Sequence, residues 1–172
     1  MDSKGNIAAK APAFKEDLLL FDIEVKAKGP KPKTIPIPDR KEAPIDPMDE
    51  IYQALLLGLR DYAHKNGFNK AVIGLSGGID SALTAVIASD ALGRENVIGV
   101  FMPSVFTSNE SRVDAEALAN NLGIQLRAIP INNIFEAYIK DRSPVFNGTQ
   151  KDITEENLQA RIRGNILMAL SN

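Results

Sequence analysis

Three short apolar runs, each followed by a segment with the pattern of a helix, constrain the fold of this chain more than any other feature. The runs are KAVIGL at 70–75, NVIGVFM at 96–102 and the segment 124–131. Apolar residues fill them almost continuously, whereas a strand with one face in water alternates polar and apolar residues. The pattern therefore predicts an α/β fold with a parallel sheet, right-handed crossovers and helices on both faces.

Helix signals surround these runs. Asp46 can cap a first helix with Pro47 at its first position, and Gly67 can end it in a left-handed conformation. The residues of this helix at four-residue spacing are expected to face the core, and they are Ile51, Leu55, Leu59 and Ala63. Further helices are expected over 81–92, from the capping pair Thr107 and Glu110 to 122, over 134–140, and from 154 to the C-terminus. Three parallel strands are few for such a sheet, so we expect it to be incomplete at its C-terminal side.

The N-terminal part has a different composition. Six of the ten prolines lie between Pro30 and Pro47, and proline fixes φ and withholds an amide, so 28–45 is predicted to be an extended linker. DLLLFDIEV at 17–25 is predicted to form a strand. So short a segment cannot bury a core of its own. We therefore expect 1–27 to be the tail of another domain and 46–172 to form a second domain.

The composition excludes several classes of site. The chain has no cysteine and one histidine, His64, which excludes disulfides, thiolate metal sites, a cysteine nucleophile and multi-histidine zinc sites. Its 20 basic and 22 acidic residues give a net charge of −2, without the basic footprint of a nucleic-acid-binding protein. No apolar stretch approaches the roughly 18 residues of a membrane span. A cytoplasmic protein that binds neither nucleic acid nor membrane is expected.

The loop SGGIDS at 76–81 joins the first predicted strand to the following helix. Such loops, at the carboxyl ends of parallel strands, are where open α/β sheets bind ligands. Gly77 and Gly78 allow positive φ and close backbone approach, while helix-start amides and the hydroxyls of Ser76 and Ser81 suit phosphate. Asp80 suits a magnesium ion beside that phosphate. The alternative is an ordinary glycine turn with serine as a helix cap.

This loop differs from two common phosphate-binding patterns. It lacks the GK[ST] of the Walker loop and the G-x-G-x-x-G of dinucleotide-binding folds. A loop of this kind without a lysine is suited to holding pyrophosphate as a leaving group. The loop therefore indicates adenylyl transfer.

A second motif, EENLQARIRG at 155–164, lies in the last predicted helix. Asn157 and Arg161 are four residues apart and share a helix face, which Asn165 continues. A separate apolar stripe is predicted to face the core, and it consists of Leu158, Ile162, Ile166 and Leu170. From the pattern alone, the polar face is best explained as solvent-exposed.

SGGIDS resembles the signature of the PP-loop ATP pyrophosphatase superfamily. Four segments in this order resemble NAD synthetases over 46–172: IGLSGGIDSALTA, GVFMPS, the pattern SxxSxxDAxxLAxxLGI from Ser108 to Ile124, and EENLQARIRG. FKEDLLLFDIEV resembles the end of the nitrilase-type glutaminase domain of glutamine-dependent members. The implied fold is an adenine nucleotide α-hydrolase-like parallel sheet.

The resemblance implies a ligase that amidates deamido-NAD with ATP and Mg²⁺ through an adenylate, using ammonia derived from glutamine. It implies a homo-oligomer, a dimer through the synthetase domain. Asn157 and Arg161 are implied to bind deamido-NAD, Asp80 to bind the metal, and no residue to act as a protein nucleophile. The ATP-binding residues it implies are Leu75, Ser76, Gly77, Gly78, Ile79, Asp80, Ser81 and Met102.

Two features depart from the family pattern. Val105 stands where many relatives carry a basic residue, as MPSR or MPSK, so the resemblance assigns no phosphate or substrate role to this position. Without cysteine, the glutaminase reaction cannot occur in this chain. The chain is therefore expected to be a fragment, inactive by itself, with the N-terminal half of a synthetase domain. Alternatives are another PP-loop adenylating ligase, such as a GMP synthetase-like enzyme, and a non-catalytic nucleotide-binding remnant.

Overall fold

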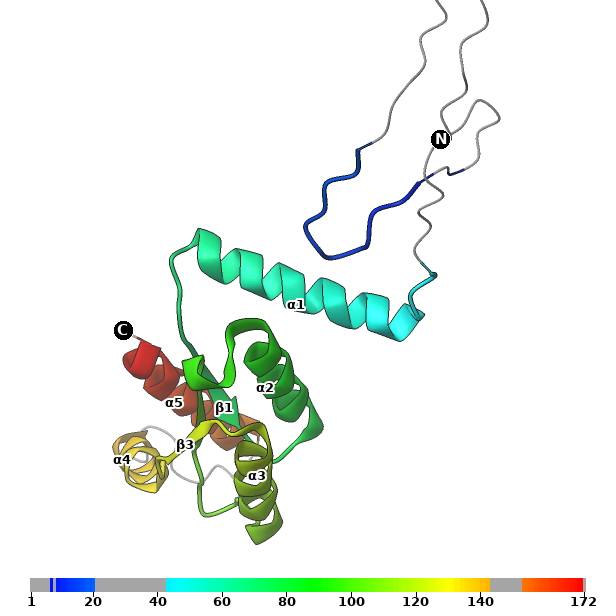
Figure 1. Cartoon of the computed structure of the whole chain (residues 1–172). Coiled ribbons are helices and arrows are strands. Elements are labelled where there is room, and N and C mark those ends of the chain that lie inside the picture. The colour runs from blue at the N-terminus through cyan, green and yellow to red at the C-terminus, as the bar shows by residue number, and fades with distance from the viewer. Residues whose placement is uncertain (1–6, 8, 21–42, 143–152, 172) are drawn as a thin grey trace, which may run out of the picture. The chain divides into compact units, whose positions relative to one another are not determined.

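The computed structural model describes residues 7, 9–20, 43–142 and 153–171 of the chain (Figure 1). Contacts divide the chain into two units, Met1–Ala54 and Leu55–Asn172. Residues 17–20, the described part of the strand expected over 17–25, form no strand, because no described segment pairs with them. Most of the expected linker at 28–45 lies outside the described residues, and the predicted domain boundaries stay predictions.

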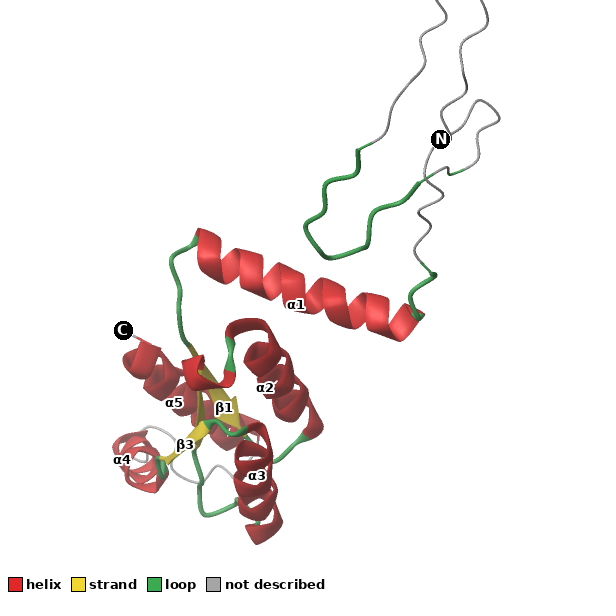
Figure 2. Ribbon diagram, viewed as in Figure 1, coloured by secondary structure: helices red, strands yellow, loops and turns green. Residues whose placement is uncertain are grey.

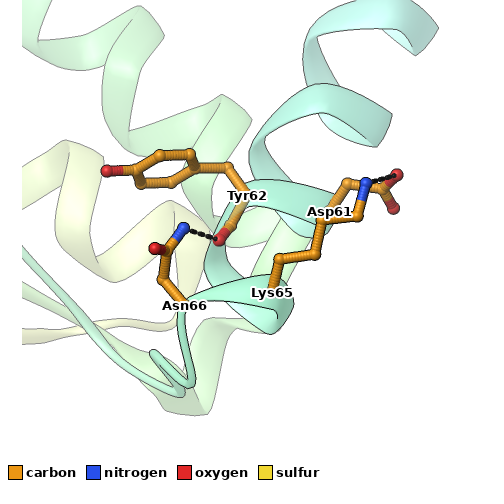
Figure 3. Close-up of polar contacts among 4 residues, drawn as sticks. All are labelled: Asp61, Tyr62, Lys65 and Asn66. Atoms are coloured by element: carbon orange, nitrogen blue, oxygen red, sulfur yellow. Dashed lines mark hydrogen bonds and ion pairs between the residues drawn. The ribbon is translucent and has the colours of Figure 1, made fainter.

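Helix α1 (Pro47–Lys65) begins as predicted, with the amide of Met48 donating to Asp46 Oδ1 at 2.8 Å. Figure 3 shows its last turn, where Lys65 Nζ lies 3.4 Å from Asp61 Oδ2 and Asn66 Nδ2 donates to the Tyr62 carbonyl at 2.8 Å. The exposed ion pair contributes little, about 0.3–0.5 kcal/mol at most. Gly67 follows with a φ of 74°, the predicted left-handed ending.

The prediction for the core-facing side of α1 is confirmed for two of its four residues: Leu59 packs against the core that contains Leu75 and Phe101, and Ala63 is buried. Leu56 and Ala63 are buried, whereas Ile51 and Leu55 are exposed. Leucines occupy 55–57 consecutively, so the sequence pattern does not distinguish between neighbouring faces. Leu56 lies one turn before Leu59, which packs against this core, so the buried face includes Leu56.

Three parallel strands form the sheet in the order β1 (Ala71–Leu75), β2 (Val97–Phe101) and β3 (Gln125–Ala128). Leu75 pairs with Phe101, and Phe101 pairs with Ala128. All three strands therefore end at the same edge of the sheet. This arrangement confirms the predicted parallel α/β fold.

The connections follow the predicted alternation. They are α2 (Ile79–Leu92), a 3₁₀ turn η1 (Arg94–Asn96), α3 (Asn109–Leu122), α4 (Asn132–Arg142) and α5 (Ile153–Ser171). The cap of α3 is Ser108, whose Oγ accepts from the Ser111 amide at 3.2 Å. Thr107, predicted as part of a capping pair, instead accepts from the Ser104 amide at 2.8 Å. Among the residues described, no helix is both long and apolar enough to cross a membrane.

Helices cover both faces of the sheet, α2 and α3 on one and α4 and α5 on the other (Figure 2). Alternate strand residues enter opposite cores: Phe101 packs with α2 and α3, while Val100 and Met102 pack with α4 and α5. Continuous apolar strands are the consequence of this two-sided burial. The predicted apolar stripe of α5 lies in the second core, with Leu158, Ile162, Ile166 and Leu170.

Candidate functional site

The loop 76–81 leaves the carboxyl end of β1, and α2 begins inside it at Ile79. Gly77 has a φ of 82°, and a Cβ there would lie 2.6 Å from the backbone oxygen of Ser111. Only glycine fits this position without displacing the start of α3. Gly78 is the N-cap of α2 and has no side chain that could accept a bond from the first amides of the helix. The first amides of α2 have no partners within the helix, so this end suits an anion.

Two serine hydroxyls hold the loop in shape. Ser81 Oγ donates to the Gly78 carbonyl at 2.9 Å and accepts from the Ser76 amide at 3.2 Å. Ser76 Oγ accepts from the Gly78 amide at 3.1 Å and lies 3.1 Å from Ser81 Oγ. Since the Ser81 proton is used on Gly78, Ser76 is the donor between the hydroxyls. The loop is thus organised by its own bonds before any ligand binds.

Asp80 lies in the first turn of α2, and its side chain is exposed, as is that of Ile79. No group of three or more histidine, cysteine, aspartate or glutamate side chains in the described part of the chain could hold a metal ion. Magnesium needs no such group, because it is commonly held by one or two carboxylates together with substrate phosphates. A single carboxylate beside a loop whose geometry suits phosphate fits this kind of site.

A cavity of about 490 Å³, here named the strand-end cavity, opens at the carboxyl ends of β1 and β2 against α5. Its size suits a small-molecule ligand. The residues that line it come from β1, β2, α5 and the loops that follow the two strands: Gly74, Leu75, Ser76, Phe101, Met102, Thr107, Ala160, Arg163, Gly164 and Leu167. Three of the residues predicted to bind ATP line this cavity, namely Leu75, Ser76 and Met102. Ser76 also belongs to the loop 76–81, so the cavity adjoins the loop.

A second cavity of about 640 Å³, here named the polar cavity, lies beside the first and shares Thr107 and Arg163 with it. Four buried polar residues occur in the described part of the chain, and three of them line this cavity: Ser104, Glu155 and Gln159. Glu156, Phe106 and Ile153 complete the lining. The polar cavity is therefore suited to a ligand with hydrogen-bonding groups.

Arg163 is the residue that sequence reasoning missed. Its Nε donates to the Met102 carbonyl at 3.1 Å, across 61 residues, and it lines both cavities. Burial lowers the pKa of its guanidinium from the ordinary value. The available signal was spacing: Glu155, Gln159 and Arg163 recur every four residues and form a third stripe on α5.

Asn157 and Arg161 lie on a different side of α5, where both side chains are exposed. Arg161 Nη1 donates to the Asn157 carbonyl at 3.2 Å. The structure therefore places Asn157 and Arg161 next to each other, but neither residue lines the strand-end cavity or the polar cavity. Val105, beyond the end of β2, is 64% exposed. A ligand held by Asn157 and Arg161 would therefore approach α5 from its outer side.

Comparisons with known proteins identify related sequences. The family model described as NAD synthase matches residues 51–172. The glutamine-dependent NAD(+) synthetase of Thermotoga maritima is 58% identical over 142 residues, which cover 83% of this chain and 23% of that protein. The enzyme of the same name from Synechocystis is 46% identical over 175 residues, covering 100% of this chain and 30% of the relative.

A solved structure is similar as well. Glutamine-dependent NAD+ synthetase from Acinetobacter baumannii, in complex with ADP, matches with a TM-score of 0.75 and 45% identity. The match covers 77% of this chain and 25% of that one. The chain thus spans less than a third of the length of these relatives.

Proposed function

We propose that this chain, which belongs to the NAD synthase family, carries the ATP-binding part of a glutamine-dependent NAD synthetase. The observation that supports this most is the loop 76–81, organised by its own hydrogen bonds at the carboxyl end of β1, beside the strand-end cavity. The adenine and ribose of ATP would occupy that cavity, and its phosphates would extend toward the loop.

The proposed reaction has two steps. A carboxylate oxygen of deamido-NAD attacks the α-phosphorus of ATP, the bond to the bridging oxygen breaks, and pyrophosphate leaves. Ammonia then attacks the acyl carbon of the adenylate, loses a proton, and AMP leaves as the amide of NAD forms. The residues of this chain act by positioning and by stabilising charge, without a protein nucleophile.

The loop would bind the departing pyrophosphate through the amides at the start of α2, and Ser76 and Ser81 would turn their hydroxyl protons from the bonds within the loop to the phosphate oxygens. Asp80 would hold Mg²⁺, which supplies positive charge against the phosphate oxygens. The exposed side chains of Asn157 and Arg161 would bind deamido-NAD on the outer side of α5, where a second copy of the chain would also pack. Arginine suits this role because its planar fork binds phosphate or carboxylate in a bidentate way. Ammonia would come from glutamine hydrolysed outside this chain, in the cytoplasm.

Calorimetric titration of the purified chain with ATP and Mg²⁺ tests the first part of the proposal, and the expected result is binding at a single site. AMP release with deamido-NAD and ammonium tests the second part. Because the chain is expected to be inactive by itself, the effect of Asp80→Asn is measured on binding: it is expected to weaken the Mg²⁺-dependent binding of ATP about tenfold while the chain stays folded. ATP binding without AMP release is the result expected of a fragment that is inactive by itself, and a chain that binds no ATP would contradict the proposal. Release stimulated by xanthosine monophosphate and not by deamido-NAD would indicate a GMP synthetase-like ligase.

A further inference from the structure

The carbonyl of Met102 lies one residue beyond the last pair of the ladder between β1 and β2, which joins Leu75 to Phe101. Along a central strand of a parallel sheet, the N–H and C=O of one residue point toward the neighbouring strand on one side, and those of the next residue point toward the strand on the other side. The carbonyls of Phe101 and Pro103 accept bonds from two amides that follow β3. The Met102 carbonyl, between them in sequence, therefore faces the side of β1.

Strand β1 ends too early to supply a donor to this carbonyl. After Leu75 the chain turns into the loop, and the Ser76 amide donates to Ser81 Oγ. Arg163 Nε reaches the Met102 carbonyl from α5 at 3.1 Å. Met102 is 6% exposed, and a buried carbonyl without a partner costs free energy. Arg163 thus provides the hydrogen bond that a longer β1 would have made.

Met102 forms a wall of the strand-end cavity. A Cβ added to Gly74 would lie 3.3 Å from Met102 Cε. The Met102 side chain therefore lies directly over Gly74 in β1. Across the cavity, α5 presents the small residues Ala160 and Gly164. The Met102 and Leu167 side chains cover Gly74, whereas the small residues Ala160 and Gly164 leave a slot on the α5 side of the cavity. The width of this slot depends on where the backbone of Met102 is held.

We propose that Arg163 is a positioning residue for nucleotide binding, which acts by fixing the Met102 carbonyl and with it one wall of the slot that receives the adenine. The inference rests on the proposed function, because the slot has this role only if the chain binds ATP. In this proposal the effect on nucleotide affinity comes from the hydrogen bond that Arg163 Nε donates, and not from the positive charge of the guanidinium. A direct ion pair between the guanidinium and the phosphates of ATP is the competing explanation.

Three substitutions at one position separate these explanations. Arg163→Gln places an N–H donor on the same fourth side-chain atom as Nε but removes the charge. Arg163→Lys keeps the charge but carries its nitrogen one bond further out. Arg163→Met has a similar length and neither feature. Arg127→Met, at an exposed position of β3, is the control for losing one positive charge.

The experiment is calorimetric titration of the wild-type chain and the four variants with adenosine and with ATP and Mg²⁺, after circular dichroism has confirmed that each variant is folded. We expect about tenfold weaker binding of both ligands by the lysine and methionine variants, and binding within about threefold of wild type by the glutamine and Arg127→Met variants. Full affinity in the lysine variant with a loss in the glutamine variant, or a loss for ATP alone, would overturn the inference in favour of a phosphate contact. Unchanged affinity in every Arg163 variant would overturn it while leaving the proposed function intact. A wild-type chain that binds neither ligand would overturn both.

Discussion

The loop 76–81 and helix α5 carry the two clearest motifs of this chain, and they are organised in different ways. In the loop, the partners of each polar group lie within a few residues: Ser76 and Ser81 bond to each other and to Gly78. On α5, neighbouring polar residues point to different surroundings. Arg163 bonds to the Met102 carbonyl, 61 residues away and just beyond the end of β2, while Arg161, two residues earlier, is exposed.

The difference lies in what determines the role of each residue. A loop that bonds to itself has its geometry encoded by its own short sequence, because residue type and spacing decide which hydrogen bonds can form. A helix has several faces, and the role of each face depends on the element that packs against it. On α5 three stripes at four-residue spacing lie against the apolar core, against the cavities and toward the outer surface.

The largest effect is expected from a change that breaks the loop. Gly77→Ala adds a Cβ 2.6 Å from a backbone oxygen at a φ of 82°, so we expect a loss of at least about 2 kcal/mol in unfolding free energy, and loss of ATP binding. Urea unfolding and calorimetric titration measure the two effects.

Gly58→Ala is the matched control, because a Cβ in that turn of α1 would meet no atom within 4 Å. It should stabilise the chain by about 0.5–1 kcal/mol through helix propensity. Similar unfolding free energies for the two alanine variants would show that the loop does not need glycine at position 77.

A smaller effect is expected when the loop keeps its backbone and loses one hydroxyl. Ser81→Ala removes one bond to Gly78 and two to Ser76, so we expect ATP affinity to fall by about ten- to 100-fold. Thr84→Ala, one turn along the same helix, removes a hydroxyl that donates to the Asp80 carbonyl at 2.8 Å. Comparable ATP affinities in the two variants would contradict the special role of Ser81. Titration calorimetry supplies both values.

The sequence predicted the features that depend on local pattern. The parallel sheet followed from apolar runs, and the position of the loop between β1 and α2 followed from its glycines and serines. What it could not predict are contacts between distant segments. The approach of Gly77 to Ser111, and of Arg163 to Met102, depends on how α3 and α5 pack. The roles of Asp80, Asn157 and Arg161 stay predictions.

The two polar stripes of α5 are expected to influence the binding of different substrates. Asn157→Ala and Arg161→Met should each raise the Kd for deamido-NAD by about tenfold, because each removes a hydrogen-bonding group at the proposed acceptor surface. Both should leave ATP affinity close to wild type, opposite to Arg163→Met. Calorimetric titration of each variant with deamido-NAD and with ATP gives the comparison. Equal changes in the two Kd values would show that α5 acts as one unit instead of presenting separate faces.

The smallest effect is expected at the start of α3, against which Gly77 packs. The backbone amide of Glu110 and the Ser108 side chain lower the pKa of the Glu110 carboxyl from its ordinary value, so the folded state favours the ionised form. This contribution is present above the pKa of the unfolded chain and disappears as pH falls through the lower pKa of the folded state. Glu110→Gln should therefore lower the melting temperature slightly at neutral pH, with a difference that vanishes in acid. In a Ser108→Ala background the difference at neutral pH should be smaller, because that background removes one of the two hydrogen bonds to the carboxylate. A difference that persists in acid would mean that Glu110 acts through packing instead of charge.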